Sequence, residues 1–261
     1  MTLINGVDYY YEVCGKGSPV LLLHGGMETS EALTPLQQHL AESHTIISVD
    51  LHGHGATPLG DRVWNMEDIA DDLASLVKSI GYNQVDLLGF SLGAGIAARV
   101  AIQHPESINR LILVSGFYSF DGFYPELREQ QQQISGSMAQ EFYNTPLGLA
   151  YLKRAPKDEL ARLLDSIGAM FRTKLDWSSD VRRITAPVLL VYGDSDMYTP
   201  EYMISFFKLL GGGQKDGGWQ GEGVPRNHLA ILPGQTHYTI TANPLLAQLA
   251  TNFFANNGEN G

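Results

Sequence analysis

The chain has 261 residues, of which 44% are hydrophobic and 17% charged, and its 28 acidic and 17 basic residues give a formal net charge of −11. The length suits one large domain with a well-buried core, and the negative charge argues against a nucleic-acid partner. The apolar runs are too short to span a membrane, and a single cysteine, Cys14, excludes an internal disulfide and a cysteine-based metal cluster.

The N-terminal residues 1–6 lack the basic start and the apolar run of a secretory signal, so we expect a soluble, cytoplasmic protein with no membrane partner. Two short apolar segments, 2–4 and 7–13, flank the pair Asn5-Gly6. Asn-Gly is the usual two-residue turn between antiparallel strands. The sequence therefore predicts an N-terminal β-hairpin.

Further along the chain, short apolar runs rich in β-branched residues alternate with helical patterns. The runs are candidate parallel strands, and they occupy residues 19–23, 45–49, 84–88, 110–114, 187–192 and 228–232. The clearest helix covers 66–80, with Gly81 as its stop, and a second covers about 92–103. This alternation predicts a doubly wound, mostly parallel α/β sheet, which binds ligands at the carboxyl ends of its strands.

The alternation is interrupted between residues 117 and 180, where helical patterns such as 159–167 replace the strands. We therefore expect a helical cap at 117–180, inserted into an α/β core formed by 1–116 and 181–261. Aromatic and methionine side chains are frequent in the insertion, and they either pack against one another or line a pocket. A glycine-rich stretch, 211–223, predicts a flexible surface connection before the last strand.

The segment Gly89-Phe90-Ser91-Leu92-Gly93 matches the Gly-x-Ser-x-Gly pattern of a nucleophile elbow. The pattern has a steric cause, because a serine in a strained turn between a strand and a helix needs neighbours without side chains. A predicted strand precedes Ser91 and a helix of small residues follows it, so the positive end of the helix dipole points at the serine. This context predicts that Ser91 is a nucleophile.

The start of the same helix, residues 93–98 (GAGIAA), also fits the glycine fingerprint of dinucleotide-binding folds. Such a fold needs an acidic residue after the next strand to bind a ribose, and its fingerprint lies on the first strand of the unit. Here the next strand, 110–114, is followed by Ser115. We therefore reject a nucleotide cofactor.

A glycine-lined loop, His24-Gly25-Gly26-Met27, follows the first predicted parallel strand. Backbone N–H groups in such a loop can point at a carbonyl under attack and stabilise the oxyanion. We expect the N–H groups of Gly26 and Leu92 to form this oxyanion hole, with Met27 as the alternative to Gly26.

Five segments in a fixed order carry a resemblance to a known family. They are residues 24–26 (HGG), 50–55 (DLHGHG), 89–93 (GFSLG), 193–196 (GDSD) and 233–237 (PGQTH). In this order they resemble the α/β-hydrolase superfamily, in its serine esterase and perhydrolase-like branch, over nearly the whole chain. The resemblance implies a catalytic triad in the order serine, acid, histidine, carried by Ser91, Asp196 and His237.

Two of these residues are also favoured by their positions. Of eight histidines, only His237 follows the last predicted strand, where its side chain can reach over the edge of the sheet. Asp194 and Asp196 both lie between a predicted strand and a helix that we expect to start at Pro200. Asp196 lies nearer the middle of this loop and is three residues after Gly193, so we favour it over Asp194.

The resemblance implies hydrolysis of carboxylic esters of small or medium apolar acyl compounds through an acyl-enzyme, with no metal or organic cofactor. The expected partner is a small ester-like substrate, and the expected assembly is a monomer or a homodimer. Metal-free perhydrolase or haloperoxidase-like chemistry is the nearest alternative. Carbon–carbon bond hydrolysis is disfavoured by Tyr238, where that group has tryptophan. A ligand-binding, receptor-like protein with slow residual turnover is an alternative of another class.

Overall fold

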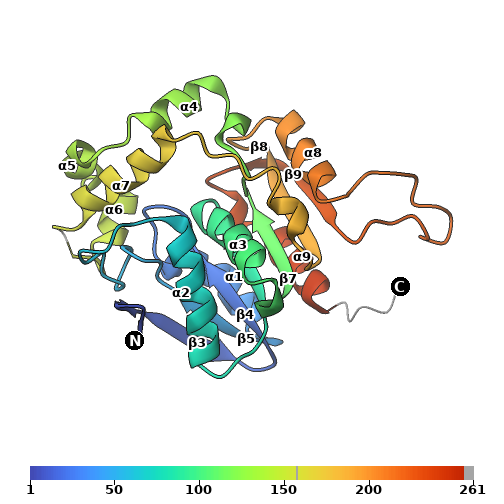
Figure 1. The fold of residues 1–261 in the computed structure, drawn as a ribbon, viewed down its shortest axis with the longest axis horizontal. Coiled ribbons are helices and arrows are strands. Elements are labelled where there is room, and N and C mark those ends of the chain that lie inside the picture. The colour runs from blue at the N-terminus through green and yellow to red at the C-terminus, as the bar shows by residue number, and fades with distance from the viewer. Residues whose placement is uncertain (157, 256–261) are drawn as a thin grey trace.

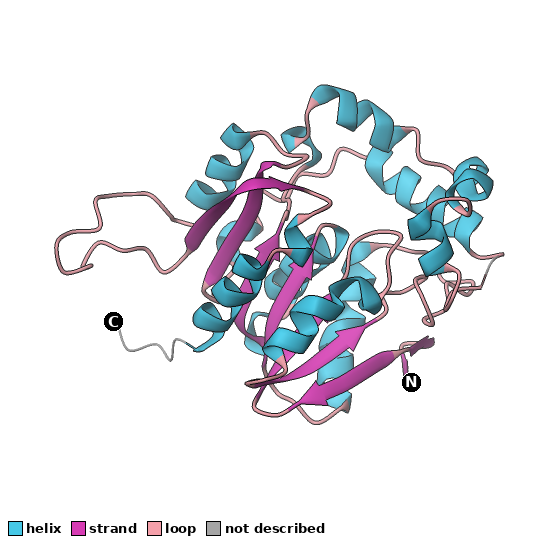
Figure 2. Cartoon of the chain, turned by 180° about the vertical axis from the view of Figure 1, so that it is seen from behind, coloured by secondary structure: helices cyan, strands magenta, loops and turns pink. Residues whose placement is uncertain are grey.

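The computed structural model describes residues 1–156 and 158–255. A seven-stranded sheet lies at its centre, and helices cover both faces of the sheet (Figures 1 and 2). The strand order is β3-β5-β4-β6-β7-β8-β9, and each neighbouring pair is parallel except β3 with β5. The predicted doubly wound, mostly parallel α/β sheet is confirmed. The strands are β3 (Tyr11–Gly15), β4 (Ser18–Leu23), β5 (His44–Val49), β6 (Val85–Phe90), β7 (Ile108–Val114), β8 (Val188–Ser195) and β9 (His228–Thr236).

The predicted N-terminal hairpin is a separate antiparallel pair, β1 (Thr2–Ile4) with β2 (Val7–Tyr9). Asn5 and Gly6 turn between the two strands with φ values of 47° and 88°. Both values are in the left-handed region, which the tight hairpin turn requires and which asparagine and glycine tolerate best.

Three predicted strands depart most from their expected bounds, and four of the others differ by one or two residues at one or both ends. The predicted strand 7–13 is divided into β2 and β3 at Tyr10, because the Tyr10 N–H donates to Thr57 Oγ1 and leaves the ladder. Strands β8 and β9 both continue beyond their predicted ends, and Ser195 still pairs with Thr236. These extensions are polar, so the apolar pattern could not mark them.

The strands of the sheet are buried on both faces, and alternate side chains belong to two hydrophobic clusters. Leu21 and Leu23 of β4 pack with α2 and α3, whereas Val20 and Leu22 pack with α1 and α9 on the other face. The helices outside the 117–180 segment are α1 (Thr34–Leu40), α2 (Met66–Ser79), α3 (Leu92–Gln103), α8 (Pro200–Leu209) and α9 (Pro244–Ala255). The two helices predicted between strands, α2 and α3, form within one residue of the expected bounds.

Segment 117–180 forms an arch of helices above the upper end of the sheet in Figure 1. It contains α4 (Pro125–Gln132), α5 (Ala139–Phe142), α6 (Pro146–Tyr151) and α7 (Leu160–Arg172). Polar contacts tie the arch to the loop after β5: Tyr151 donates from its hydroxyl to Gly53 O at 2.9 Å, and the Glu159 carboxylate accepts from Leu59 N–H at 2.8 Å. The arch is therefore anchored on the loop that follows β5, the strand next to the edge strand β3.

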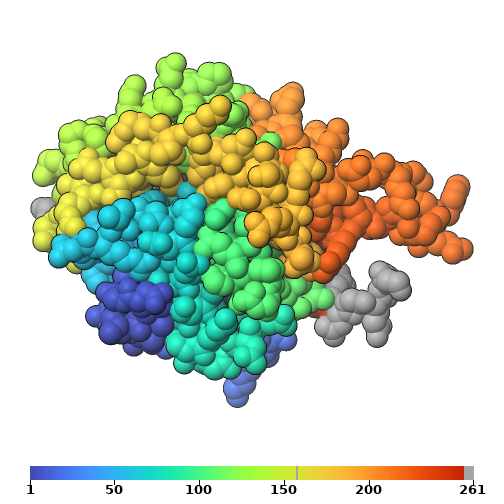
Figure 3. Space-filling model, in the orientation of Figure 1, coloured from blue at the N-terminus to red at the C-terminus, as the bar shows by residue number. Residues whose placement is uncertain are grey.

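The glycine-rich connection between α8 and β9 projects from the body of the molecule (Figure 3). Trp219 in this connection is fully exposed. Within the described residues, no helix is long and apolar enough to cross a membrane.

A buried carboxylate joins the hairpin to α2. Asp72 is fully buried and accepts hydrogen bonds from Tyr9 Oη at 2.8 Å, from Asn5 Nδ2 at 2.8 Å and from Arg62 Nη1 at 2.6 Å. We expect Asp72→Ala to lower the free energy of unfolding by about 2–4 kcal/mol, because the buried Tyr9 hydroxyl, the partly buried Arg62 guanidinium and the Asn5 amide all lose their acceptor. Asp68→Ala removes the other, half-exposed partner of Arg62 and should cost less than about 1 kcal/mol. Urea unfolding of both variants measures the difference, and equal losses would contradict this account.

Candidate active site

Ser91 occupies a strained turn between β6 and α3. Its φ of 53° and ψ of −116° are rare for a residue with a side chain. The flanking glycines make the turn possible: a Cβ atom at Gly89 would lie 2.2 Å from Gly93 O, and one at Gly93 would lie 2.4 Å from His24 O. The turn is held by a hydrogen bond from Ser91 N–H to Val114 O at 2.9 Å.

The structure brings the three predicted triad residues together. His237, in the loop after β9, has Nε2 at 2.9 Å from Ser91 Oγ and Nδ1 at 2.9 Å from Asp196 Oδ1. Because a carboxylate only accepts hydrogen bonds, Nδ1 of the neutral ring carries the proton and Nε2 is free to accept from the Ser91 hydroxyl. The His237 ring is buried and packs on Phe90, with 5.0 Å between the ring centroids.

Asp196 is held as an ionised acceptor at the end of β8. Its Oδ1 accepts from Met197 N–H as well as His237, and its Oδ2 accepts from the Ser115 hydroxyl at 2.5 Å and from Gly193 N–H at 3.2 Å. Burial opposes ionisation, but the hydrogen bonds and the nearby His237 outweigh it and hold the pKa of Asp196 below its usual value.

Asp194, the alternative acid, lies apart from His237. It is exposed in the extension of β8, and its carboxylate accepts from Gly234 N–H at 3.0 Å across to β9. It therefore joins the two strand extensions.

Ser115 was not identified from the sequence as part of this site. It follows β7, is fully buried and has φ 49°, a second left-handed residue one strand away from Ser91. Its backbone N–H donates to Val191 O and its side chain donates to Asp196. The only sequence signal was its position directly after a predicted parallel strand, where ligand-binding residues gather.

The loop after β4 lies beside the elbow. A Cβ atom at Gly26 would contact the Leu92 side chain at 3.5 Å, and Met27 next to it has φ 59°. Within the described residues, the N–H groups of Gly26, Met27 and Leu92 have no hydrogen-bond acceptor. Free N–H groups beside a nucleophile can bind the oxyanion that develops when it attacks a carbonyl.

His24 holds this loop in place with two hydrogen bonds. Its Nδ1 donates to Gly25 O at 2.7 Å and its Nε2 accepts from Leu51 N–H at 3.0 Å. Burial lowers the pKa of His24, which keeps the ring neutral, as this pair of hydrogen bonds requires. The neighbouring His54 is also buried, and burial, with electrostatic repulsion between the two imidazoles as a smaller cause, lowers the pKa of His54 to about 3. Both rings are therefore structural parts of the loop.

A pocket of about 390 Å³ opens above Ser91 and His237. The arch contributes much of its wall, including three aromatic residues of segment 117–180, Phe117, Phe123 and Phe171. The other wall comes from the loops that carry the triad. Together, the residues that line it are Gly25, Gly26, Met27, Glu28, Phe90, Ser91, Leu92, Phe117, Phe123, Gln131, Ile134, Leu147, Ile167, Phe171, Met197, Tyr198, His237, Tyr238 and Thr241.

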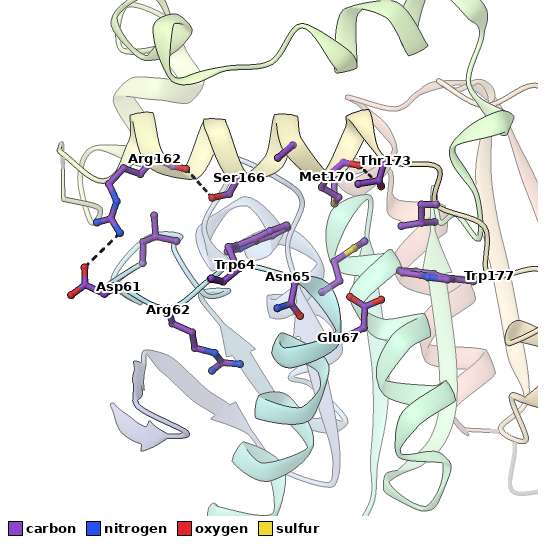
Figure 4. Close-up of a pocket in the computed structure, with 15 residues that line it drawn as sticks. Asp61, Arg62, Trp64, Asn65, Glu67, Arg162, Ser166, Met170, Thr173 and Trp177 are labelled. Carbon is purple, nitrogen blue, oxygen red and sulfur yellow. Dashed lines mark hydrogen bonds and ion pairs between the residues drawn. The ribbon is translucent and has the colours of Figure 1, made fainter.

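A larger cavity, about 640 Å³, lies on the opposite face of α7 and contains no triad residue (Figure 4). Ser166 and Met170 of α7 point into it, whereas Ile167 and Phe171 line the pocket above Ser91. Trp64 forms its floor and donates from Nε1 to His52 O. Helix α7 is thus a wall shared by two cavities, and Ser91 and His237 line only one of them.

No group of three or more histidine, cysteine, aspartate or glutamate side chains in the described ranges is arranged to hold a metal ion. Ser91, His237 and Asp196 are instead joined by hydrogen bonds in the order that a nucleophile, a base and an orienting acid would require.

Comparison with known proteins agrees with this arrangement of strands and loops. The sequence model of the alpha/beta hydrolase fold family matches residues 18–154, more than half of the chain. The chain belongs to this family. A 2-(acetamidomethylene)succinate hydrolase of Mesorhizobium japonicum is 25% identical over 259 residues, which cover 92% of this chain and 88% of that protein.

Two further similarities are of interest for the chemistry. A bifunctional esterase/perhydrolase of Acinetobacter calcoaceticus is 24% identical over 77% of this chain and 83% of its own. The structure of a thermophilic esterase from Thermogutta terrifontis superposes with a TM-score of 0.73 and 21% identity, covering 95% of this chain and 93% of that one. The structural likeness describes the fold, and the family is one of hydrolases.

The contact between Ser115 and Asp196 is open to a direct test. We expect Ser115→Ala to slow the reaction of Ser91 with a fluorophosphonate probe about tenfold, because the carboxylate loses a charge-assisted hydrogen bond worth about 1.5 kcal/mol. The loss also raises the pKa of Asp196, so the labelling rate should begin to fall at a higher pH on acidification. Ser195→Ala, which alters an exposed neighbour of Asp194, is the matched control. Identical pH profiles for both variants would refute the role of Ser115.

Proposed function

We propose that this protein is a serine hydrolase that cleaves carboxylic esters of small or medium apolar acyl compounds through an acyl-enzyme. The observation that carries the proposal is the chain of two 2.9 Å contacts from Ser91 Oγ through His237 to Asp196, at the base of a pocket walled largely by apolar side chains. Membership of a hydrolase family supports the proposal, as does the general tendency of α/β sheets to bind ligands at the carboxyl ends of their strands.

In the proposed reaction, His237 Nε2 takes the proton of the Ser91 hydroxyl while Ser91 Oγ bonds to the ester carbonyl carbon. The carbonyl oxygen becomes an oxyanion, which the N–H groups of Gly26 and Leu92 stabilise, with Met27 N–H as the alternative donor. The tetrahedral intermediate then expels the alcohol, which receives the proton from His237, and the acyl group stays on Ser91.

In the second half of the reaction, water replaces the alcohol. His237 takes a proton from the water as its oxygen attacks the acyl carbon, and the carboxylic acid leaves as the proton returns to Ser91 Oγ. Asp196 keeps the imidazole in the tautomer with its proton on Nδ1 and stabilises the imidazolium formed in each step. Its low pKa means that it stays charged throughout.

Perhydrolysis is the second candidate, supported by the similarity to a bifunctional esterase/perhydrolase. It needs the same acyl-enzyme, with hydrogen peroxide in place of water. Carbon–carbon bond hydrolysis of dienoic acids, the activity named for a relative from Metapseudomonas resinovorans, is less well supported. Its substrate carries a carboxylate, and none of the described residues that line the pocket is lysine or arginine.

We further propose that segment 117–180 acts as a cap on a core of residues 1–116 and 181–261 and sets the acyl preference. Support comes from the wall of the pocket, because Phe123, Ile134, Ile167 and Phe171 all belong to this segment. The proposed triad lies outside it, so the cap can vary without altering the chemistry.

The nucleophile is tested by Ser91→Ala. We expect turnover of 4-nitrophenyl butyrate to fall about 10⁴-fold or more and fluorophosphonate labelling to vanish, while the circular dichroism spectrum is unchanged. Wild-type turnover well above one per minute on several esters distinguishes an enzyme from a receptor that reacts once. Labelling of the alanine variant at the wild-type rate would overturn the assignment.

The orienting acid is tested by comparing Asp196→Asn with Asp194→Asn. The first should reduce ester turnover by about 10³- to 10⁴-fold, because the imidazole loses its preferred tautomer and its charge partner. The second removes a charge from an exposed carboxylate two residues away and should change turnover less than about threefold. A larger loss in Asp194→Asn would be incompatible with the proposed triad.

A further inference from the structure

Glu28 is the one acidic side chain among the described residues that line the pocket. It lies in the loop after β4, is half-buried, and its Oε2 accepts from Gly25 N–H at 2.9 Å. A Cβ atom at Gly25 would contact both Glu28 Oε2 at 2.8 Å and the Phe90 ring at 3.0 Å, and Phe90 in turn packs on His237. Glu28 is therefore close to the reacting groups, although the proposed reaction does not use it.

The second oxygen of Glu28 has no partner in the described part of the chain. This side chain makes only the hydrogen bond with Gly25 N–H. Its Oε1 atom is not fully buried, so it remains accessible to a ligand. Burial raises the pKa of Glu28, while the Gly25 N–H and the charge of His237 act in the opposite direction. A partly desolvated carboxyl group with a free oxygen is stabilised by any donor that reaches it.

Gln131, Tyr198, Tyr238 and Thr241 also line the pocket, but no hydrogen bond joins any of them to Glu28. Among the described residues, the surrounding wall offers the Glu28 carboxyl group no cation to pair with. It is formed mainly by aromatic and aliphatic groups, with no lysine or arginine among the described lining residues. An anionic substrate group would meet the Glu28 charge in a poorly solvated space with no compensating cation, which is unfavourable. A hydroxyl or ammonium group would instead gain a hydrogen bond.

We propose that Glu28 is a specificity-determining residue that binds a hydrogen-bond donor on the substrate, a hydroxyl or an ammonium group, and excludes substrates that carry a carboxylate there. The inference rests on the proposed ester hydrolysis and names its substrate class: apolar esters with a donor group, not half-esters of dicarboxylic acids. It also distinguishes this pocket from that of a protein that acts on a succinate derivative, as the Mesorhizobium relative is named.

The test uses four 4-nitrophenyl esters of equal chain length, those of hexanoic, 6-hydroxyhexanoic, 6-aminohexanoic and adipic acid. With the full-length protein at neutral pH, we expect kcat/KM for the aminohexanoate to exceed that for the adipate at least tenfold. In Glu28→Gln, whose amide oxygen can still accept from Gly25 N–H, this ratio should fall at least tenfold towards unity. Comparing kcat/KM for the hydroxyhexanoate with that for the aminohexanoate shows whether Glu28 prefers a neutral donor or a cation.

Two further variants keep the result interpretable. Glu28→Ala should change the ratio in the same direction and also lower kcat for all four esters, because the Gly25 N–H loses its acceptor. Glu42→Gln removes an exposed charge elsewhere and should leave the ratio within twofold of wild type. Turnover of hexanoate with an unchanged ratio in both Glu28 variants would overturn the role of Glu28 alone. Absence of turnover of every ester by the wild type would overturn the proposed function and this inference with it.

Discussion

The strained backbone at Ser91 is the constraint on which the rest of the site depends. A serine with φ 53° between β6 and α3 exposes its Oγ at the carboxyl edge of the sheet. Backbone oxygen atoms, of Gly93 beside Gly89 and of His24 beside Gly93, leave no room for a Cβ atom at either glycine. Such a conformation costs about 1–3 kcal/mol and persists only where surrounding structure enforces it. Here the enforcement comes from the buried strand β6, which is paired on both sides, and from the Ser91 N–H bond to Val114 O.

The order of the strands then determines which other residues can reach Ser91. Strands β6, β7, β8 and β9 are consecutive neighbours, and Ser91, Ser115, Asp196 and His237 each follow one of them. Four residues spread over 146 positions of sequence thus form one hydrogen-bonded row across the edge of the sheet. Each contact is made by a side chain beyond a strand end, so the row inherits the rigidity of the ladder. Ser91 and His237 line the pocket, whereas Ser115 and Asp196 are buried behind them.

The loop proposed to supply the oxyanion donors is supported by a second buried polar group, Asp50. Asp50 Oδ1 accepts from both the N–H and the hydroxyl of Ser30, and Asp50 Oδ2 accepts from Ala56 N–H. Glycine is required at position 55, with φ 55°, because a Cβ atom there would lie 2.2 Å from Asp50 Oδ2. Segment 50–55 is therefore structural: it holds the His24 loop from below and offers Gly53 O to the arch through Tyr151.

The sequence by itself determined the features that are encoded in short stretches of chain. The elbow at 89–93, the Asn5-Gly6 turn and the alternation of buried strands with α2 and α3 could all be predicted, since local sterics and hydrophobic periodicity produce them. The sequence also favoured Asp196 over Asp194, and in the structure it is Asp196 that lies against His237. The tertiary structure was needed to show that Ser115 and Glu28 border the site and that β8 and β9 run beyond their apolar cores. These outcomes depend on how distant segments pack, and a carboxylate or hydroxyl gives no local signal of the partner that packing will bring to it.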